Sequence, residues 1–172
     1  YRSNIDSVCI SGDVTTIPNA AFQGAHIKEL VIEEGVEVIE PYAFMSTLVK
    51  EIELPRSVTE IGTYSFYTTA LTAVKGGENV QTVGSRAFYP SRRLTIYADS
   101  ENALVRFARD NNITVTLHAP YFISLSSVEA EKRDNSVNYI MDSLRAADKL
   151  GATKVVVHSG SCSKMTRAEA LY

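Results

Sequence analysis

A 22-residue period runs through the first two thirds of this 172-residue chain and restricts its fold more than any other feature. Each of four repeats begins with a valine and has an isoleucine or valine three positions later. A small residue and a phenylalanine follow; the phenylalanines are Phe22, Phe44, Phe66 and Phe88. A fixed period in the low twenties is typical of a solenoid, in which each repeat stacks on the next and buries a continuous core.

Each repeat also contains a second apolar cluster with the alternation of a strand. Leu30 and Ile32 match Ile52 and Leu54 one repeat later, and we expect all four side chains to point inward. We expect the phenylalanine to follow a short helical turn that places its ring in the axis of the stack. Ser100 is expected to cap a helix that covers the end of the repeat array, with Asn111-Asn112 as its stop.

Four glutamates lie at outward positions of the predicted strands or directly after them. We expect these residues to cluster on one side of the sheet: Glu29, Glu33, Glu51 and Glu53. An acidic patch of this kind attracts a basic partner or a cation. A solvated strand face with no binding role is the alternative, and it is the commoner of the two.

The motif V-x-x-I-x-x-x-A-F, repeated in register, resembles the BspA type leucine-rich repeats of bacterial cell surfaces over about residues 5–112. The resemblance implies adhesion or protein binding, with no catalytic residues in the repeats. We therefore predict a solenoid domain with a C-terminal capping helix over residues 1–112, and a second domain over residues 113–172.

The second segment has a β-α-β pattern, with strands over residues 113–117 and 154–157. Nearly continuous apolar strands are typical of parallel sheets that are buried on both faces. The helix between them is expected to begin at a Ser126–Glu129 capping box and to end at Gly151. Its inner apolar stripe is expected to be Val137, Ile140, Met141, Leu144, Ala147 and Leu150.

His118 and His158 lie at the carboxyl ends of these two strands. Because a right-handed crossover makes the strands parallel and neighbours lie ~4.8 Å apart, the two imidazoles could converge on one metal ion. Two structural histidines are the first alternative. Weak, adventitious metal binding by this pair, with Cys162, is the second.

The segments LHAPYFISL and VVHSGS, whose histidines are 40 residues apart, resemble the endonuclease IV family. Its members are zinc-dependent TIM barrels that cleave DNA at abasic sites. The resemblance implies that His118 and His158 are zinc ligands and that Tyr121 contacts DNA. The family's later glutamate, aspartate and histidine ligands have no counterpart in this sequence, so we expect no phosphodiester cleavage by this chain alone.

The predicted fold is therefore α/β overall, a leucine-rich-repeat solenoid of short strands and helical turns followed by a βαβ fragment of a TIM barrel. The charge balance is −4 over residues 1–112 and +1 over residues 113–172, without the basic stripe of an autonomous nucleic-acid binder. We expect the repeat face to bind a protein partner. We expect DNA binding only if the barrel were complete, and zinc binding at most at a partial site. An exposed strand edge in the βαβ segment predicts self-association.

The two resemblances together suggest a fusion, natural or engineered. Because the chain starts with Tyr1 in place of Met and shows no basic-then-apolar leader, we expect it to be a fragment or a mature segment of a longer protein. The repeats point to a cell-surface or secreted protein and the tail to a cytoplasmic one, so localisation stays open. Cys9 and Cys162 lie too far apart in sequence to suggest a disulfide framework, and we expect two buried thiols.

Overall fold

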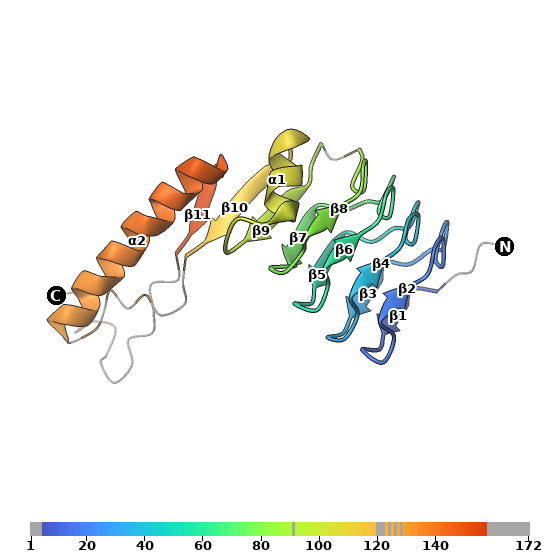
Figure 1. Ribbon diagram of the computed structural model, residues 1–172, viewed down its shortest axis with the longest axis horizontal. Coiled ribbons are helices and arrows are strands. Elements are labelled where there is room, and N and C mark those ends of the chain that lie inside the picture. Colours follow the sequence, from blue (N-terminus) through green and yellow to red (C-terminus); the bar gives the residue numbers. More distant parts are fainter. Residues whose placement is uncertain are drawn as a thin grey trace. The chain divides into compact units, whose positions relative to one another are not determined.

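The computed structural model describes residues 5–90, 92–119, 123, 125, 127 and 129–157. These residues form two compact units, divided between Val115 and Thr116. The first unit contains a solenoid of about five coils, drawn from blue to yellow-green in Figure 1. Each coil has one longer strand; these are β1 (Ser7–Ile10), β3 (Glu29–Ile32), β5 (Glu51–Leu54), β7 (Ala73–Gly76) and β9 (Thr95–Ala98). The shorter strands are β2 (Thr16–Ile17), β4 (Val38–Ile39), β6 (Glu60–Ile61) and β8 (Thr82–Val83).

Strand pairing in the solenoid is parallel and follows the 22-residue period. Ser7 of β1 pairs with Glu29 of β3, and Glu51 of β5 pairs with Ala73 of β7. The short strands form their own sheet in the order β2-β4-β6-β8. Every pairing therefore joins equivalent positions of neighbouring repeats, which confirms the predicted solenoid.

The core of the solenoid is a stack of phenylalanine rings. Neighbouring rings of Phe22, Phe44, Phe66 and Phe88 lie 5.3, 5.2 and 5.4 Å apart between centroids and are nearly parallel. Phe44 and Phe66 are completely buried, and the inward strand residues Ile39, Ile52 and Ile61 are at most 2% exposed. The ring ladder was predicted correctly, but the segment before each ring is a hydrogen-bonded turn and not a helical one.

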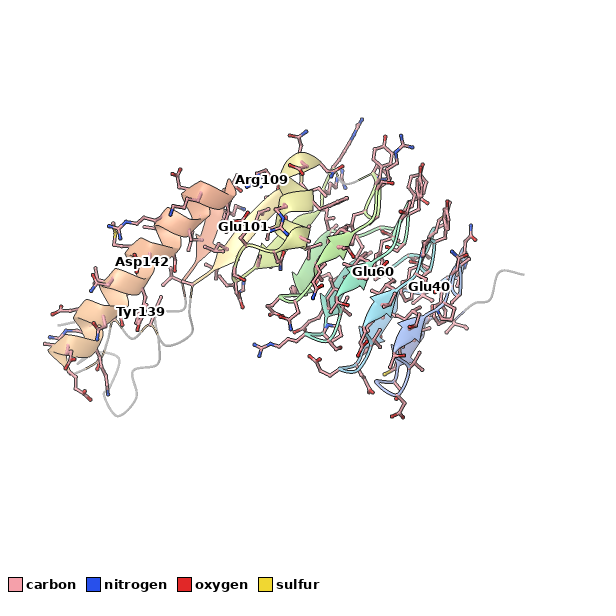
Figure 2. The ribbon with its side chains drawn as sticks, in the orientation of Figure 1. Glu40, Glu60, Glu101, Arg109, Tyr139 and Asp142 are labelled. Atoms are coloured by element: carbon pink, nitrogen blue, oxygen red, sulfur yellow. The ribbon has the colours of Figure 1, made fainter. Side chains whose placement is uncertain are left out.

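Helix α1 (Ala103–Asp110) covers the last coil, as predicted. Phe107 packs edge-on against Phe88, with 5.9 Å between ring centroids, and so closes the phenylalanine stack. The predicted cap was wrong: Asn102, not Ser100, is the N-cap, because its side chain accepts a hydrogen bond from Val105 N–H at 3.0 Å. Figure 2 labels Glu101 and Arg109, whose side chains approach to 4.0 Å at this helix.

The second unit contains the end of β10 (Thr114–His118), α2 (Ala130–Leu150) and β11 (Lys154–Val156). β10 and β11 are parallel and joined through α2, as the predicted β-α-β pattern requires. Gly151 ends α2 in a left-handed conformation, as predicted. Glu129 is the N-cap, but its side chain makes no capping bond, and Ser126 lies outside the described residues.

The predicted inner stripe of α2 is only partly correct. Ala147 and Leu150 are buried, whereas Val137, Met141 and Leu144 are 50, 44 and 47% exposed. The side that α2 buries also contains Ser136 and Ser143, whose hydroxyls donate to backbone carbonyls one turn earlier. Helix α2 contacts the short strand β11. This strand is too short to cover a stripe of six apolar residues. Among the described residues, no helix has the length and apolar character needed to span a membrane.

Candidate functional site

The four predicted glutamates lie on the longer strands or directly after them, and all are exposed. Glu29 and Glu51 begin β3 and β5, Glu53 occupies the next outward position of β5, and Glu33 follows β3. The exposed side chain of Val31 lies between them along β3. We call Glu29, Val31, Glu33, Glu51 and Glu53 the acidic strand face.

Part of this charge is compensated within the solenoid. Lys75 of β7 approaches Glu51 to 3.3 Å. Glu33 accepts a hydrogen bond from Gly12 N–H at 3.3 Å and lies 3.5 Å from the Cys9 sulfur. Cys9 is exposed, so the predicted buried thiol was wrong; partial desolvation and then the Glu33 carboxylate raise the pKa of this thiol.

A cavity of about 520 Å³ opens beside the acidic strand face. Its lining includes Val31 and Glu53 of the face, together with Arg56 and Glu78. Arg56 Nε lies 3.9 Å from a Glu78 carboxylate oxygen, so an ion pair forms part of the lining of this cavity. The face thus combines exposed carboxylates with an exposed apolar side chain and lies beside a concave surface.

His118 is the last residue of β10 and is half-buried. It lies in register with Val156 of β11, and Ala119 N–H donates to the carbonyl of Val156 at 2.9 Å. The parallel pairing that the metal hypothesis requires is therefore present. His158, Tyr121 and Cys162 lie outside the described residues, so the metal and DNA contacts predicted for them stay predictions.

The described part of the chain contains no group of three or more histidine, cysteine, aspartate or glutamate side chains that could hold a metal ion.

Sequence reasoning missed a second ladder on the turns of the solenoid. Tyr42 stacks on Tyr64 at 5.4 Å, and Tyr67 stacks on Tyr89 at 5.8 Å. Arg86 lies against the rings of Tyr64 and Tyr89, with its guanidinium carbon 6.0 and 5.9 Å from their centroids. The signal was available, because both tyrosine pairs are separated by 22 residues.

Comparison with known proteins gives two overlapping family matches. Residues 1–104 match the BspA type Leucine rich repeat region in six copies. Residues 76–171 match the Xylose isomerase-like TIM barrel family. The matches share residues 76–104, so β8 and β9 belong to both.

One curated relative is "Probable endonuclease 4" of Mycoplasmoides gallisepticum, which is 42% identical over 45 residues. The aligned region is 26% of this chain and 15% of that relative, so the chain spans only a small part of the relative's length. No solved structure matches the chain. The chain therefore belongs to the BspA type leucine-rich repeat family through its solenoid and to the xylose isomerase-like TIM barrel family through its endonuclease IV-like region.

Proposed function

We propose that the chain is a protein-binding module whose solenoid presents the acidic strand face to a basic segment of a partner. The observation that carries this proposal is the set of exposed carboxylates around Val31 on consecutive coils. Carboxylates in such an array raise the local concentration of a cationic partner, and the exposed valine offers it apolar contact.

The endonuclease IV-like region has no turnover of its own in this proposal. Catalytic zinc sites use at least three protein ligands, and the family resemblance supplies two, His118 and His158. A site with two protein ligands holds zinc weakly and leaves the metal-bound water poorly oriented.

A binding experiment tests the acidic strand face. We expect a lysine-rich peptide, titrated into the 15N-labelled chain, to shift the amide signals of β3 and β5. The double variant Glu51→Gln/Glu53→Gln should weaken binding several-fold, and added salt should weaken it further because exposed charges are screened.

Glu37→Gln/Glu60→Gln is the matched control, because it removes the same charge away from the face. Glu60 lies on β6 in the sheet of short strands and is labelled in Figure 2. Equal weakening by both double variants would mean that only net charge matters. That result would overturn the proposed face.

The second candidate is a zinc-dependent abasic-site endonuclease. The parallel β10–β11 pair, with His118 at its carboxyl end, favours it. The activity named for the relative would here require further metal ligands from outside this chain.

Zinc content and nicking of abasic DNA separate the two candidates, with His118→Ala as the test and His26→Ala as the control. If the chain binds zinc stoichiometrically and His118→Ala abolishes its nicking of abasic DNA, the chain is the enzyme. That result would contradict the proposal that the endonuclease IV-like region has no turnover.

A further inference from the structure

A second cavity, of about 420 Å³, lies where the last repeat meets the end of α1. Arg86, Tyr89 and Arg92 of the repeat line one part of it. Phe107 and Asp110 of α1, with the two asparagines that follow the helix, line the rest. We call this cavity the Tyr89 pocket. It shares no lining residue with the acidic strand face and lies entirely within the first unit.

The cationic side of the Tyr89 pocket is held in place by the tyrosine ladder. Arg86 donates a hydrogen bond to the Tyr64 hydroxyl at 3.2 Å, and its guanidinium lies against both neighbouring rings. Cation–π contacts of this kind fix an arginine before any ligand arrives. A preorganised guanidinium loses little side-chain entropy when it binds a carboxylate through two parallel hydrogen bonds.

Two other charged side chains, Arg92 and Asp110, line the pocket. Arg92 and Asp110 are exposed, and within the described part of the chain neither side chain makes a hydrogen bond or an ion pair. The adjacent Asn111 is fixed by its own amide, which donates to the Phe107 carbonyl at 2.8 Å. The pocket therefore offers a guanidinium and a carboxylate to an incoming ligand, next to exposed aromatic surface on Tyr89.

The charge of the lining matches a ligand with one negative charge, since two arginines and one aspartate line the pocket. The surrounding sequence is also more basic: residues 62–112 carry six Lys and Arg against four Asp and Glu, whereas residues 1–61 carry four against ten. A free phosphate or phosphate monoester, with a charge of roughly −1.5 to −2 at neutral pH, would exceed this balance and would make no use of the aromatic surface.

We propose that the Tyr89 pocket binds a hexuronate, an acidic sugar with a single carboxylate. Arg86 and Arg92 bind the carboxylate, while Asp110 and the neighbouring asparagine amides bind ring hydroxyls. The C–H face of the sugar ring packs on the part of Tyr89 that Tyr67 and Arg86 leave uncovered, since Tyr89 is 54% exposed. The cavity volume lies within the range of small-molecule sites.

Titration of the 15N-labelled full chain with glucuronate tests this proposal. We expect saturable shifts of the amide signals of Tyr89, Asn111 and Asn112. Glucose, acetate and inorganic phosphate should each bind at least tenfold more weakly, because each lacks part of the recognised chemistry. Arg92→Ala and Asp110→Asn should each weaken glucuronate binding about tenfold, the usual effect of losing a charge-assisted hydrogen bond.

Arg93→Ala and Asp99→Asn are the matched controls, since both residues are exposed and neither lines the pocket. Both controls should bind glucuronate like the parent chain. Thermal unfolding followed by circular dichroism checks that every variant is folded. Absence of saturable binding, equal binding of glucose or phosphate, or unchanged binding in both Arg92→Ala and Asp110→Asn would each overturn the proposal.

Discussion

Glu34 joins two coils of the solenoid through a single carboxylate. Its oxygens accept hydrogen bonds from the backbone N–H groups of Arg56 and Ser57 on the next coil, at 2.8 and 3.0 Å. The bond from Arg56 is the largest cause that lowers the pKa of Glu34 below its ordinary range, and the bond from Ser57 lowers it further. The ionised form is therefore the one that the folded solenoid favours.

We expect Glu34→Gln to lower the free energy of unfolding at neutral pH. Because the folded pKa is depressed, the wild-type contribution is complete above the unfolded carboxyl pKa and is lost as pH falls through the lower folded pKa. Chemical denaturation across that acidic range should therefore show the two proteins converging in stability. Glu37→Gln, at an exposed side chain, should show no such convergence. A wild-type advantage that persists unchanged in acid would contradict this account.

Phenylalanine rings at the centre of the stack are more deeply buried than the ring at its first coil, so they should contribute more to the free energy of unfolding. Phe66 is fully buried between Phe44 and Phe88, whereas Phe22 at the first coil is half-buried and stacks on one ring. A removed central ring leaves a cavity that the coils above and below cannot fill, because their rings are held by their own backbone bonds.

We expect Phe66→Ala to reduce the free energy of unfolding by about 3–5 kcal/mol, measured by chemical denaturation. Phe22→Ala should cost clearly less, since part of that ring already contacts water. Equal losses at the two positions would mean that the ladder is not a continuous core.

Asn102 connects α1 to the repeats as well as capping it. Its amide donates to the Gly77 carbonyl at 3.1 Å while its oxygen receives the Val105 N–H. Asn102→Ala should therefore lower the free energy of unfolding by about 0.5–2 kcal/mol, the usual effect of losing an N-cap, or by more. Thermal unfolding measures this loss. Ser100→Ala, at the position that the sequence favoured, should change stability by less than about 0.5 kcal/mol. The reverse order would restore Ser100 as the cap.

The sequence predicted which residues enter the solenoid core but not the turns that place them. Tyr42, Ser46 and Thr68 have positive φ values of 62, 60 and 53°, although none is glycine. Their N–H groups donate to carbonyls of the next coil at 3.1, 2.8 and 2.8 Å, and this inter-coil bonding supports the unusual backbone. Residue propensity reports local preference only, so it gave no signal for turns that depend on the neighbouring coil.

Each of the two units is explained by a different kind of sequence signal. The repeat period predicted strands, register and core of the solenoid, because equivalent residues contact each other at a constant separation. In the βαβ region, helical periodicity predicted helix α2 correctly, but it did not predict which side of this helix is buried. Coverage depends on the strands present beside the helix, and periodicity carries no information about their number.

The exposed side chains of α2 lead to a prediction about association. Val137, Met141 and Leu144 form an apolar surface at helical spacing, with Tyr139 also 41% exposed. Figure 2 shows the Tyr139 and Asp142 side chains on α2. Apolar surface of this kind is costly to leave in water and favours contact between copies of the chain.

We expect light scattering to show concentration-dependent association, and Met141→Glu/Leu144→Glu to suppress it. Asn138→Glu is the control, because this exposed polar residue adds charge to α2 without removing apolar surface. Association that is equally strong in the double variant would place the contact elsewhere, with the strand edge of β11 as the next candidate.

The spacing of the inter-coil bonds also bears on how the chain can fold during synthesis. Phe22, Phe44 and Phe66 each donate a backbone N–H to a carbonyl 21 residues further along, at 2.8 Å in every case. A coil thus needs only the next coil of nascent chain to complete its hydrogen bonds. The solenoid can grow on the ribosome one coil at a time, from the N-terminus, without waiting for any distant segment.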